Sequence, residues 1–394
     1  MRARHVIAIG IGLVSVACGD DLPSVLPPLG GSSAGTSTTG ATETTAASGG
    51  LTSSTDTSAG RTEGSGLGSS STDGTDGTEG PATGTGPQVC EAPARVVPCD
   101  SPRDDPSPLQ AMGLGCDGDP HETIALEASS FSSRDPDAWR VARRLGTHDD
   151  PETGLPTWGA RHGEQVLMIS TGTIGPVDDQ GAVVMEVLEQ DANDNPDDKP
   201  LPAPMTELRG SGGIPLTDCD GVGDCSDTLW NSWLGGGAAA MDLLWFQLRT
   251  TVPAGTYGFR MDLALLSEEF PGSVGSVFND MFVVWSSSET YVGNLCFADG
   301  QPCTVTGLWP VQYAGSSPEL AGTGFGPPDT QQGGGTGWLQ VRGSATPGEA
   351  LELTFALFDM GDEELDTLVL LDGFAWDCEG CTPSPDGGCG VVER

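Results

Sequence analysis

Apolar and polar residues alternate along several segments in the second half of the chain. Leu351, Leu353, Phe355 and Leu357 would share one face of a strand, with Glu352 on the other face. Because these runs are separated by Gly- and Asp-rich loops, with little helix between them, they predict a mostly β fold built as a single jelly-roll-like β-sandwich. The predicted strands cover residues 166–170, 182–188, 241–250, 256–266, 281–285, 339–342, 350–359 and 367–376.

The chain before this pattern has a different composition. Residues 18–88 consist largely of Gly, Ser, Thr and Ala with scattered acids, and they contain few large apolar side chains. Such a segment cannot bury enough surface to offset the entropy lost on ordering, so we expect a disordered linker. Residues 138–145 fit either a short helix or an ordered loop.

The first eighteen residues are typical of an exported bacterial lipoprotein. Two arginines precede an apolar run of twelve residues, Val6–Ala17, which is too short to span a bilayer. Ser15, Val16 and Ala17 then form a lipobox-like site before Cys18. We therefore expect cleavage after residue 17, lipidation of Cys18 and a lipid-anchored location in the bacterial cell envelope, at the outer membrane. The alternative is an ordinary signal peptide with an incidental cysteine.

The number of cysteines agrees with this interpretation. The chain has 11 cysteines, and a lipidated Cys18 leaves ten, which would form five disulfides in an exported protein. Cys378 and Cys381 have a spacing seen in zinc and redox sites, but no second such motif accompanies them. Short loops favour two pairs, Cys219 with Cys225 and Cys296 with Cys303.

We accordingly divide the chain into five segments. They are a signal peptide at 1–17, the lipidated cysteine and linker at 18–88, a disulfide-pinned extension at 89–165, the sandwich at 166–378 and a cysteine-containing tail at 379–394.

The net charge of −40 decides which partners are plausible. Such a surface repels nucleic acid and anionic lipid headgroups, and it attracts cations. The alternative is that the charge serves only solubility outside the cell.

Two acidic segments about ninety residues apart flank predicted core strands. One runs through 268–280 and the other through 359–366. Clustered carboxylates repel one another unless a cation or protons relieve them, and calcium takes six to eight oxygen ligands from irregular loops. The alternative is that the acids cap turns. The candidate calcium ligands are Glu268, Glu269, Asn279, Asp280, Asp359, Asp362 and Asp366.

A third acidic stretch, Asp191–Asp198, looks like the inter-domain calcium motif of cadherins. The companion motifs and repeated domains of cadherins are missing. We therefore expect a solvated loop at this position.

Three motifs, in this order, resemble the bacterial choice-of-anchor L domains. They are Ile169–Gly172, then Ser267–Pro271 followed by Phe278–Phe282, and finally Asp359–Thr367. The resemblance covers about residues 166–378 and implies a surface domain with variable attachment to the cell. It carries no biochemical activity with it.

The favoured function is a non-catalytic, lipid-anchored surface module for adhesion or ligand binding, stabilised by calcium. It would contact the membrane through its lipid and bind an extracellular protein or glycan. We expect no enzyme, because Glu268 and Glu269 are sequence neighbours that point apart on a strand and no nucleophile motif is present. The alternative is a carbohydrate-binding domain or glycoside hydrolase, which would use some of Trp158, Trp230, Trp233, Trp245, Trp285, Trp309, Trp338 and Trp376.

Overall fold

The computed structural model describes residues 89–101, 107–185, 193–197, 199–205, 227–298, 300–309, 317–326, 333–382 and 388–393. The expected signal peptide, Cys18 and the linker lie outside these residues, and so do Cys219 and Cys225. The described residues belong to one compact unit that begins at Gly80.

The first sheet has five antiparallel strands in the order β1-β7-β15-β9-β10. Its long central strands bring together distant segments, because β15 pairs on one side with β7, about a hundred residues earlier in the chain, and on the other side with β9. The strands are β1 (Ala128–Ser132), β7 (Met241–Thr251), β9 (Met281–Ser287), β10 (Val292–Asn294) and β15 (Ala350–Asp359).

The second sheet has the order β17-β14-β8-β16-β5-β2, and β13 pairs with one end of β8. It is also antiparallel, and β8 and β16 form its centre. The strands are β2 (Trp139–Ala142), β5 (Val166–Ser170), β8 (Gly258–Ser267), β13 (Gly334–Gly335), β14 (Leu339–Ser344), β16 (Thr367–Asp377) and β17 (Gly390–Glu393).

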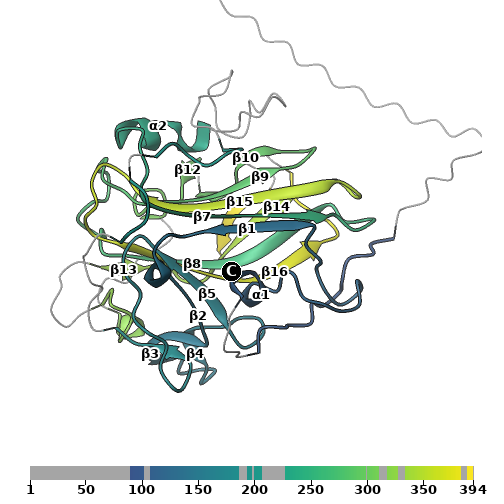
Figure 1. Ribbon diagram of the computed structural model, residues 1–394, viewed down its shortest axis with the longest axis horizontal. Helices are drawn as coiled ribbons and strands as arrows, with labels where there is room; N and C mark the ends of the chain where they lie inside the picture. Colours follow the sequence, from purple (N-terminus) through teal and green to yellow (C-terminus); the bar gives the residue numbers. More distant parts are fainter. Residues whose placement is uncertain are drawn as a thin grey trace, which may run out of the picture. The chain divides into compact units, whose positions relative to one another are not determined.

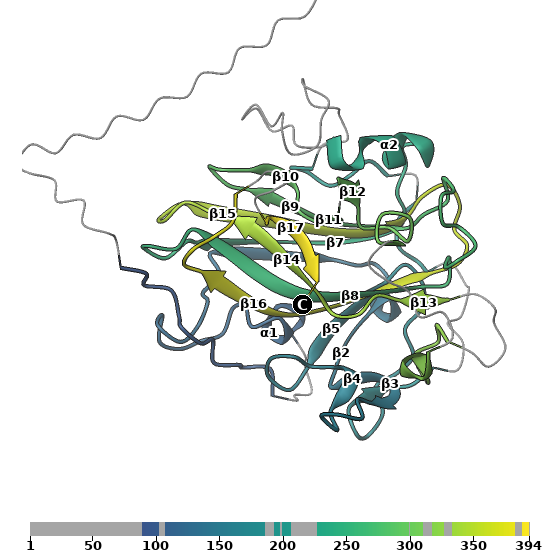
Figure 2. The same cartoon turned by 180° about the vertical axis from the view of Figure 1, so that it is seen from behind.

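The two sheets pack face to face around the main hydrophobic core. Leu353 and Phe355 of β15 meet Leu263 and Leu265 of β8 there, and all four side chains are buried. Figure 1 shows the sheets one above the other, and Figure 2 shows the same stacking from behind. This arrangement confirms the predicted mostly β, sandwich-like fold.

Smaller elements cover the outer faces of both sheets. Helix α2 (Asp227–Gly235) packs Leu229 and Trp233 onto the first sheet, and a three-stranded sheet packs Trp158 onto the second. Because both faces of the central strands are covered, their side chains are apolar on both sides. The remaining elements are α1 (Pro108–Ala111), η1 (Pro136–Ala138), β3 (Arg144–Asp149), β4 (Pro156–Gly159), β6 (Ala182–Val183), β11 (Phe297–Ala298), β12 (Gln301–Pro302) and η3 (Pro318–Leu320).

Each of the eight predicted strands corresponds to an observed one, with ends that differ by a few residues; for 182–188 the structure describes only the first part. Most of residues 138–145 belong to strands β2 and β3 instead of the short helix or ordered loop considered from the sequence. Within the segment 89–165, β1 joins the first sheet and β2 joins the second. In the tail, β17 pairs with β14. The sandwich therefore includes strands on both sides of the range 166–378.

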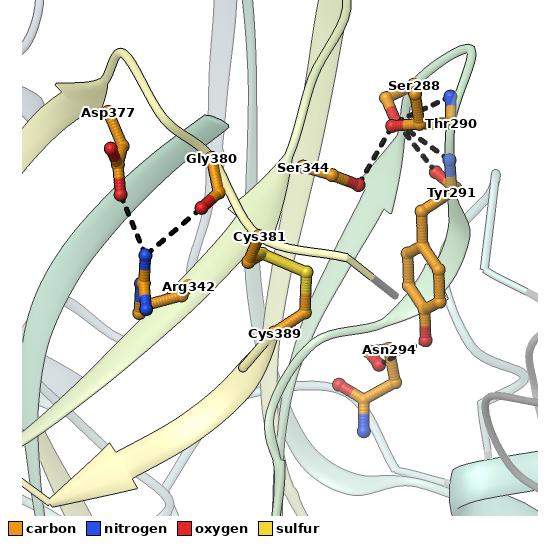
Figure 3. Close-up of a disulfide and its surroundings, with 10 residues drawn as sticks. All are labelled: Ser288, Thr290, Tyr291, Asn294, Arg342, Ser344, Asp377, Gly380, Cys381 and Cys389. Carbon is orange, nitrogen blue, oxygen red and sulfur yellow. Dashed lines mark hydrogen bonds and ion pairs between the residues drawn. A yellow bond between two sulfur atoms is a disulfide. The ribbon is translucent and has the colours of Figure 1, made fainter. Parts of the chain in front are cut away.

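Four disulfides lie within the described residues. The predicted pair Cys296–Cys303 is present, and three more join Cys90 to Cys378, Cys99 to Cys116 and Cys381 to Cys389. Cys378 and Cys381 therefore bond to different partners, which leaves no dithiol for zinc or redox chemistry. Beside the last of these disulfides, Arg342 donates to Asp377 at 2.9 Å and to the carbonyl of Gly380 at 3.2 Å (Figure 3).

Candidate functional site

The two acidic segments meet at one end of the sandwich. Glu269 lies in the turn after β8, and Asp280 directly precedes β9. Asp359 is the last residue of β15, and Asp366 directly precedes β16. The backbone N–H of Glu268 donates to the carbonyl of Asp366 at 3.0 Å, which ties the two segments together. We call Glu269, Asp280, Asp359 and Asp366 the carboxyl cluster.

Strand alternation places the first-sheet members of this cluster toward the core. Asp359 follows Phe355 and Leu357 at two-residue steps, and both of these side chains belong to the main core. Asp280 precedes the core residue Phe282 by the same step. The carboxyl cluster therefore lies at the end of the space between the sheets, where the apolar core stops.

Two threonines of the second sheet border the cluster. The N–H of Thr171 donates to the carbonyl of Thr367 at 3.0 Å, and the N–H of Thr367 donates to Oγ1 of Thr171 at 2.9 Å. The side chain of Thr171 interacts with Asp359, and that of Thr367 interacts with Asp280. These hydroxyl oxygens add to the carboxyl oxygens that gather here.

All four carboxyl groups are almost completely buried. Their residues are 1% to 3% exposed. The backbone N–H of Asp280 donates to Oε2 of Glu269 at 2.9 Å. However, neither carboxyl oxygen of Asp359 has a hydrogen bond of normal geometry, and Oδ2 of Asp280 also has none. Buried polar atoms without partners cost free energy, so these oxygens indicate a missing proton or ligand.

Burial and mutual repulsion both disfavour ionisation in the cluster. Burial is the main cause that raises the pKa of Glu269 to about 9, and the charges of Asp359 and Asp362 add to it. Burial, followed by the charge of Glu269, raises the pKa of Asp280 well above its usual range. Burial and the charge of Asp280 do the same for the pKa of Asp359. The folded chain must therefore hold protons or a cation at this point.

Gly172 makes room for the cluster. A Cβ atom at this position would lie 2.1 Å from Oδ2 of Asp366. Gly172 ends the Ile169–Gly172 motif, so the motif supplies both Thr171 and the space for Asp366. This is the physical reason for a glycine at a position where no positive φ requires one.

We predict that Gly172→Ala lowers the free energy of unfolding by about 1–3 kcal/mol, because the new methyl group must displace Asp366. Denaturant unfolding followed by tryptophan fluorescence measures this change. Gly337→Ala is the matched control, since Gly337 is exposed with no atom within 4 Å of its added Cβ. Equal stability of the two variants would contradict the placement of Asp366.

The other predicted ligands lie at the margin of the cluster. The Asn279 side chain stabilises the turn before β9: its Nδ2 donates to the carbonyl of Ser273 at 2.9 Å, and its Oδ1 accepts from the N–H of Thr306 at 3.0 Å. Asn279 thus caps a turn, which was the alternative to calcium binding considered from the sequence. The charge of Asp362 raises the pKa of Glu269. Glu268 is buried, and its backbone N–H donates to the carbonyl of Asp366.

The side chains at this end of the sandwich offer oxygen donors to a metal ion. Within the described part of the chain, no three His, Cys, Asp or Glu side chains already stand in a metal-coordinating arrangement. The unpartnered oxygens of Asp359 and Asp280, together with the two threonine hydroxyls, still form an all-oxygen set that suits calcium. Binding would therefore require these side chains to turn toward a common point.

Most tryptophans in the described residues contribute to packing. Trp233 and Trp285 are fully buried, and Trp158 and Trp376 are nearly so. Trp309 is 51% exposed and stacks on Phe270 with ring centroids 5.4 Å apart. Its loop contacts the turn between Glu269 and Asp280, because Oγ1 of Thr306 accepts from the N–H of Gly275 at 2.8 Å.

A surface cavity of about 310 Å³ lies elsewhere on the molecule. Its lining includes Glu91, His121, Glu127 and Trp376, and no member of the carboxyl cluster. The clustered acids therefore do not line this cavity.

No protein-family model, curated protein or solved structure matches this chain. The resemblance to choice-of-anchor L domains therefore rests on the sequence motifs alone. The function has to be inferred from the chemistry of the site.

Proposed function

We propose that this protein is a non-catalytic surface module whose ligand-binding loops are stabilised by calcium. The observation that carries this proposal is the buried carboxyl cluster, in which neither oxygen of Asp359 has a hydrogen bond of normal geometry. A bound cation would neutralise the carboxyl groups of the cluster and fix the loops that precede β9 and β16. Glu269, Asp280, Asp359 and Asp366 would hold it, with Thr171 and Thr367 beside them.

Calcium fits this position better than other common metals. The available donors are all oxygens from loops and strand ends, which suits a hard cation with flexible geometry, whereas magnesium demands a near-ideal octahedron. The net charge of −40 raises the local concentration of cations around the chain. The four disulfides fit an oxidising compartment outside the cytoplasm.

Surface display is the role that the first residues suggest. A lipid on Cys18 would anchor the chain, and the Gly/Ser/Thr-rich residues 18–88 would carry the sandwich away from the membrane. Among the described residues, no helix is both long and apolar enough to cross a bilayer. The motif resemblance to choice-of-anchor L domains is compatible with such display in the bacterial cell envelope.

Carbohydrate binding is the second candidate, and Trp309 favours it. An exposed indole next to the acidic end is suited to stacking on a sugar ring. A glycoside hydrolase fits less well, because the clustered carboxyl groups are buried too deeply for a substrate to reach them.

Glycan and protein arrays probed with the purified mature chain, in calcium and in chelator, test the proposal. We expect a ligand that is retained in calcium, lost in chelator, and weakened in Asp359→Asn. Trp309→Ala should abolish a glycan signal and spare a protein signal. Ligand binding that ignores both calcium and Asp359→Asn would refute the proposed role of the cluster. In cells, Cys18→Ala should release the chain from membranes, and a variant that stays membrane-bound would exclude the lipid anchor.

A further inference from the structure

A second group of acids surrounds Asp242, near the start of β7. Asp242 is 1% exposed, and neither of its carboxyl oxygens has a hydrogen bond to the rest of the protein. Its φ of 50° lies in the left-handed region, which aspartate and asparagine adopt more readily than most residues. A buried carboxyl without partners at such a position needs a compensating group.

The charges that act on Asp242 are all negative. Burial is the main cause that raises its pKa to about 7, and the charges of Asp197, Glu363 and Asp135 contribute to this shift. Lys199 forms a β-bridge with Ala240, two residues before Asp242, but its side chain is exposed and takes part in no ion pair in the described part of the chain. The surrounding protein therefore increases the cost of ionising Asp242.

Hydrogen bonds hold the acids around Asp242 in place. The N–H of Asp242 donates to Oδ1 of Asp197 at 3.1 Å, and the N–H of Leu243 donates to the carbonyl of Pro196 at 3.3 Å. The N–H of Asp194 donates to Oδ2 of Asp135 at 2.9 Å. Residues 193–197 are thus fixed between β7 and the turn that carries Asp135.

This loop differs from the solvated loop expected from the sequence. Asn193 is 6% exposed and Asn195 is 3% exposed. Oδ1 of Asn195 accepts from the backbone N–H groups of Arg134 and Asp135 at 2.6 and 3.1 Å. The buried amides make the loop a built part of the fold, so its carboxyl groups are positioned and not free in solvent.

The acids around Asp242 are distinct from the carboxyl cluster, although the two groups lie at the same end of the sandwich. Met241 pairs with Asp359 and Leu244 pairs with Leu357, so Asp242 lies in the irregular stretch between these two pairs, at one end of the β7–β15 ladder. The charges that raise the pKa of Asp242 do not include those of Asp280 or Asp359. Likewise, the charge of Asp242 is not among those that raise the pKa of Asp280 and Asp359. The loop 360–366 connects the two groups. The charge of Asp362 raises the pKa of Glu269 in the carboxyl cluster, and the charge of Glu363 raises the pKa of Asp242.

We propose that Asp242, Asp197, Asp135 and Glu363 form a second calcium site, separate from the carboxyl cluster. An ion here would tie the loop 193–197 to the loop 360–366 and to the start of β7. It would thereby rigidify the surface next to the first site. The inference rests on the proposed function only in the choice of calcium as the ion.

Calcium stoichiometry of the full mature chain tests this inference. After chelator treatment, calcium chloride is titrated calorimetrically, and bound metal is counted by atomic emission after dialysis. We expect two ions for the wild type, one for Asp242→Asn, one for Asp359→Asn and none for the double variant. Asparagine keeps the side-chain size and tolerates the left-handed backbone, so Asp242→Asn removes mainly the charge.

Two further variants guard against misfolding and non-specific effects. Asp197→Asn alters an exposed side chain and should also reduce the count to one without unfolding the protein. Asp178→Asn alters an exposed turn acid outside both groups and should still bind two ions. Two ions in both Asp242→Asn and Asp197→Asn would overturn the second site, as would a wild type that binds a single ion lost in Asp359→Asn. A single ion lost only in Asp242→Asn and Asp197→Asn would support the second site and refute the first.

Discussion

Millimolar calcium is expected to raise the melting temperature of the chelator-treated protein by about 5 °C. An ion present at a hundredfold excess over its dissociation constant stabilises the folded state by about 2.7 kcal/mol, and a domain of this size shifts by about 2 °C per kcal/mol. Asp359→Asn should lose most of this gain, because Asp359 supplies two buried oxygens, neither of which has a hydrogen bond of normal geometry. Differential scanning calorimetry in calcium and in chelator measures the shift.

Two controls make this result specific. Magnesium should give a smaller gain than calcium, since its geometry suits loop ligands poorly. Asp178→Asn should keep the full gain, because Asp178 is an exposed residue that caps the turn at 178–182. Melting curves that are identical in calcium and chelator would refute the metal site, and the acids would then be protonated groups at the end of the core.

In chelator, the stability of the protein should fall as the pH rises from about 4.5 to 9. The folded chain without an ion keeps protons on Glu269, Asp280 and Asp359 that the unfolded chain has already released, because burial raises their pKa values. The native state therefore binds more protons than the unfolded state, and the free energy of unfolding decreases with pH, by up to about 1.4 kcal/mol per pH unit for each group. Calcium competes with these protons, so its stabilising effect should grow over the same range.

Asp359→Asn should reverse the order of stability between the two conditions. At pH 8 in chelator the variant should be at least as stable as the wild type, because a neutral amide can donate to the Asp280 carboxylate. At pH 8 in calcium it should be the less stable protein. Urea unfolding at pH 5, 6.5 and 8, with and without calcium, gives six curves for each protein, and the four curves at pH 8 test the reversal.

Asp372 serves as the internal reference for these curves. Burial raises the pKa of this residue to about 8, and its carboxyl accepts hydrogen bonds from the backbone N–H groups of Arg161 and His162. Asp372 lies away from the acidic end, so its contribution is the same with and without calcium and cancels in the difference. A calcium effect that does not change between pH 5 and pH 8 would contradict the cluster as its origin.

Sequence reasoning identified the acids of the carboxyl cluster and missed two other residues, Thr171 and Asp242. The position of the acids beside predicted strands marked Glu269, Asp280 and Asp359 as candidate ligands, and the structure brings them together. Thr171 carried a weaker signal, through the Ile169–Gly172 motif. Asp242 carried none, because a single acid at the start of an apolar strand does not show that its carboxyl will be covered.

The sequence by itself determined the features that depend on local order along the chain. Alternation placed Leu353 and Phe355 in the core, because the side chains of a strand point to opposite faces in turn. The Cys296–Cys303 disulfide followed from a short loop that closes easily. The excess of acids, and their position beside strand ends, could also be read directly.

Only the tertiary structure decided the features that depend on which distant segments pack together. The Cys90–Cys378 disulfide spans 288 residues, and β1 and β2 join two different sheets, although both precede the predicted sandwich. The tertiary structure also decided which polar side chains are buried in the core. Asn279 and Asp280 are adjacent in sequence, yet the first stabilises a turn while the second lies in the closed end of the core. Burial sets the cost of a charge, and burial is a property of the packed sheets that no single segment encodes.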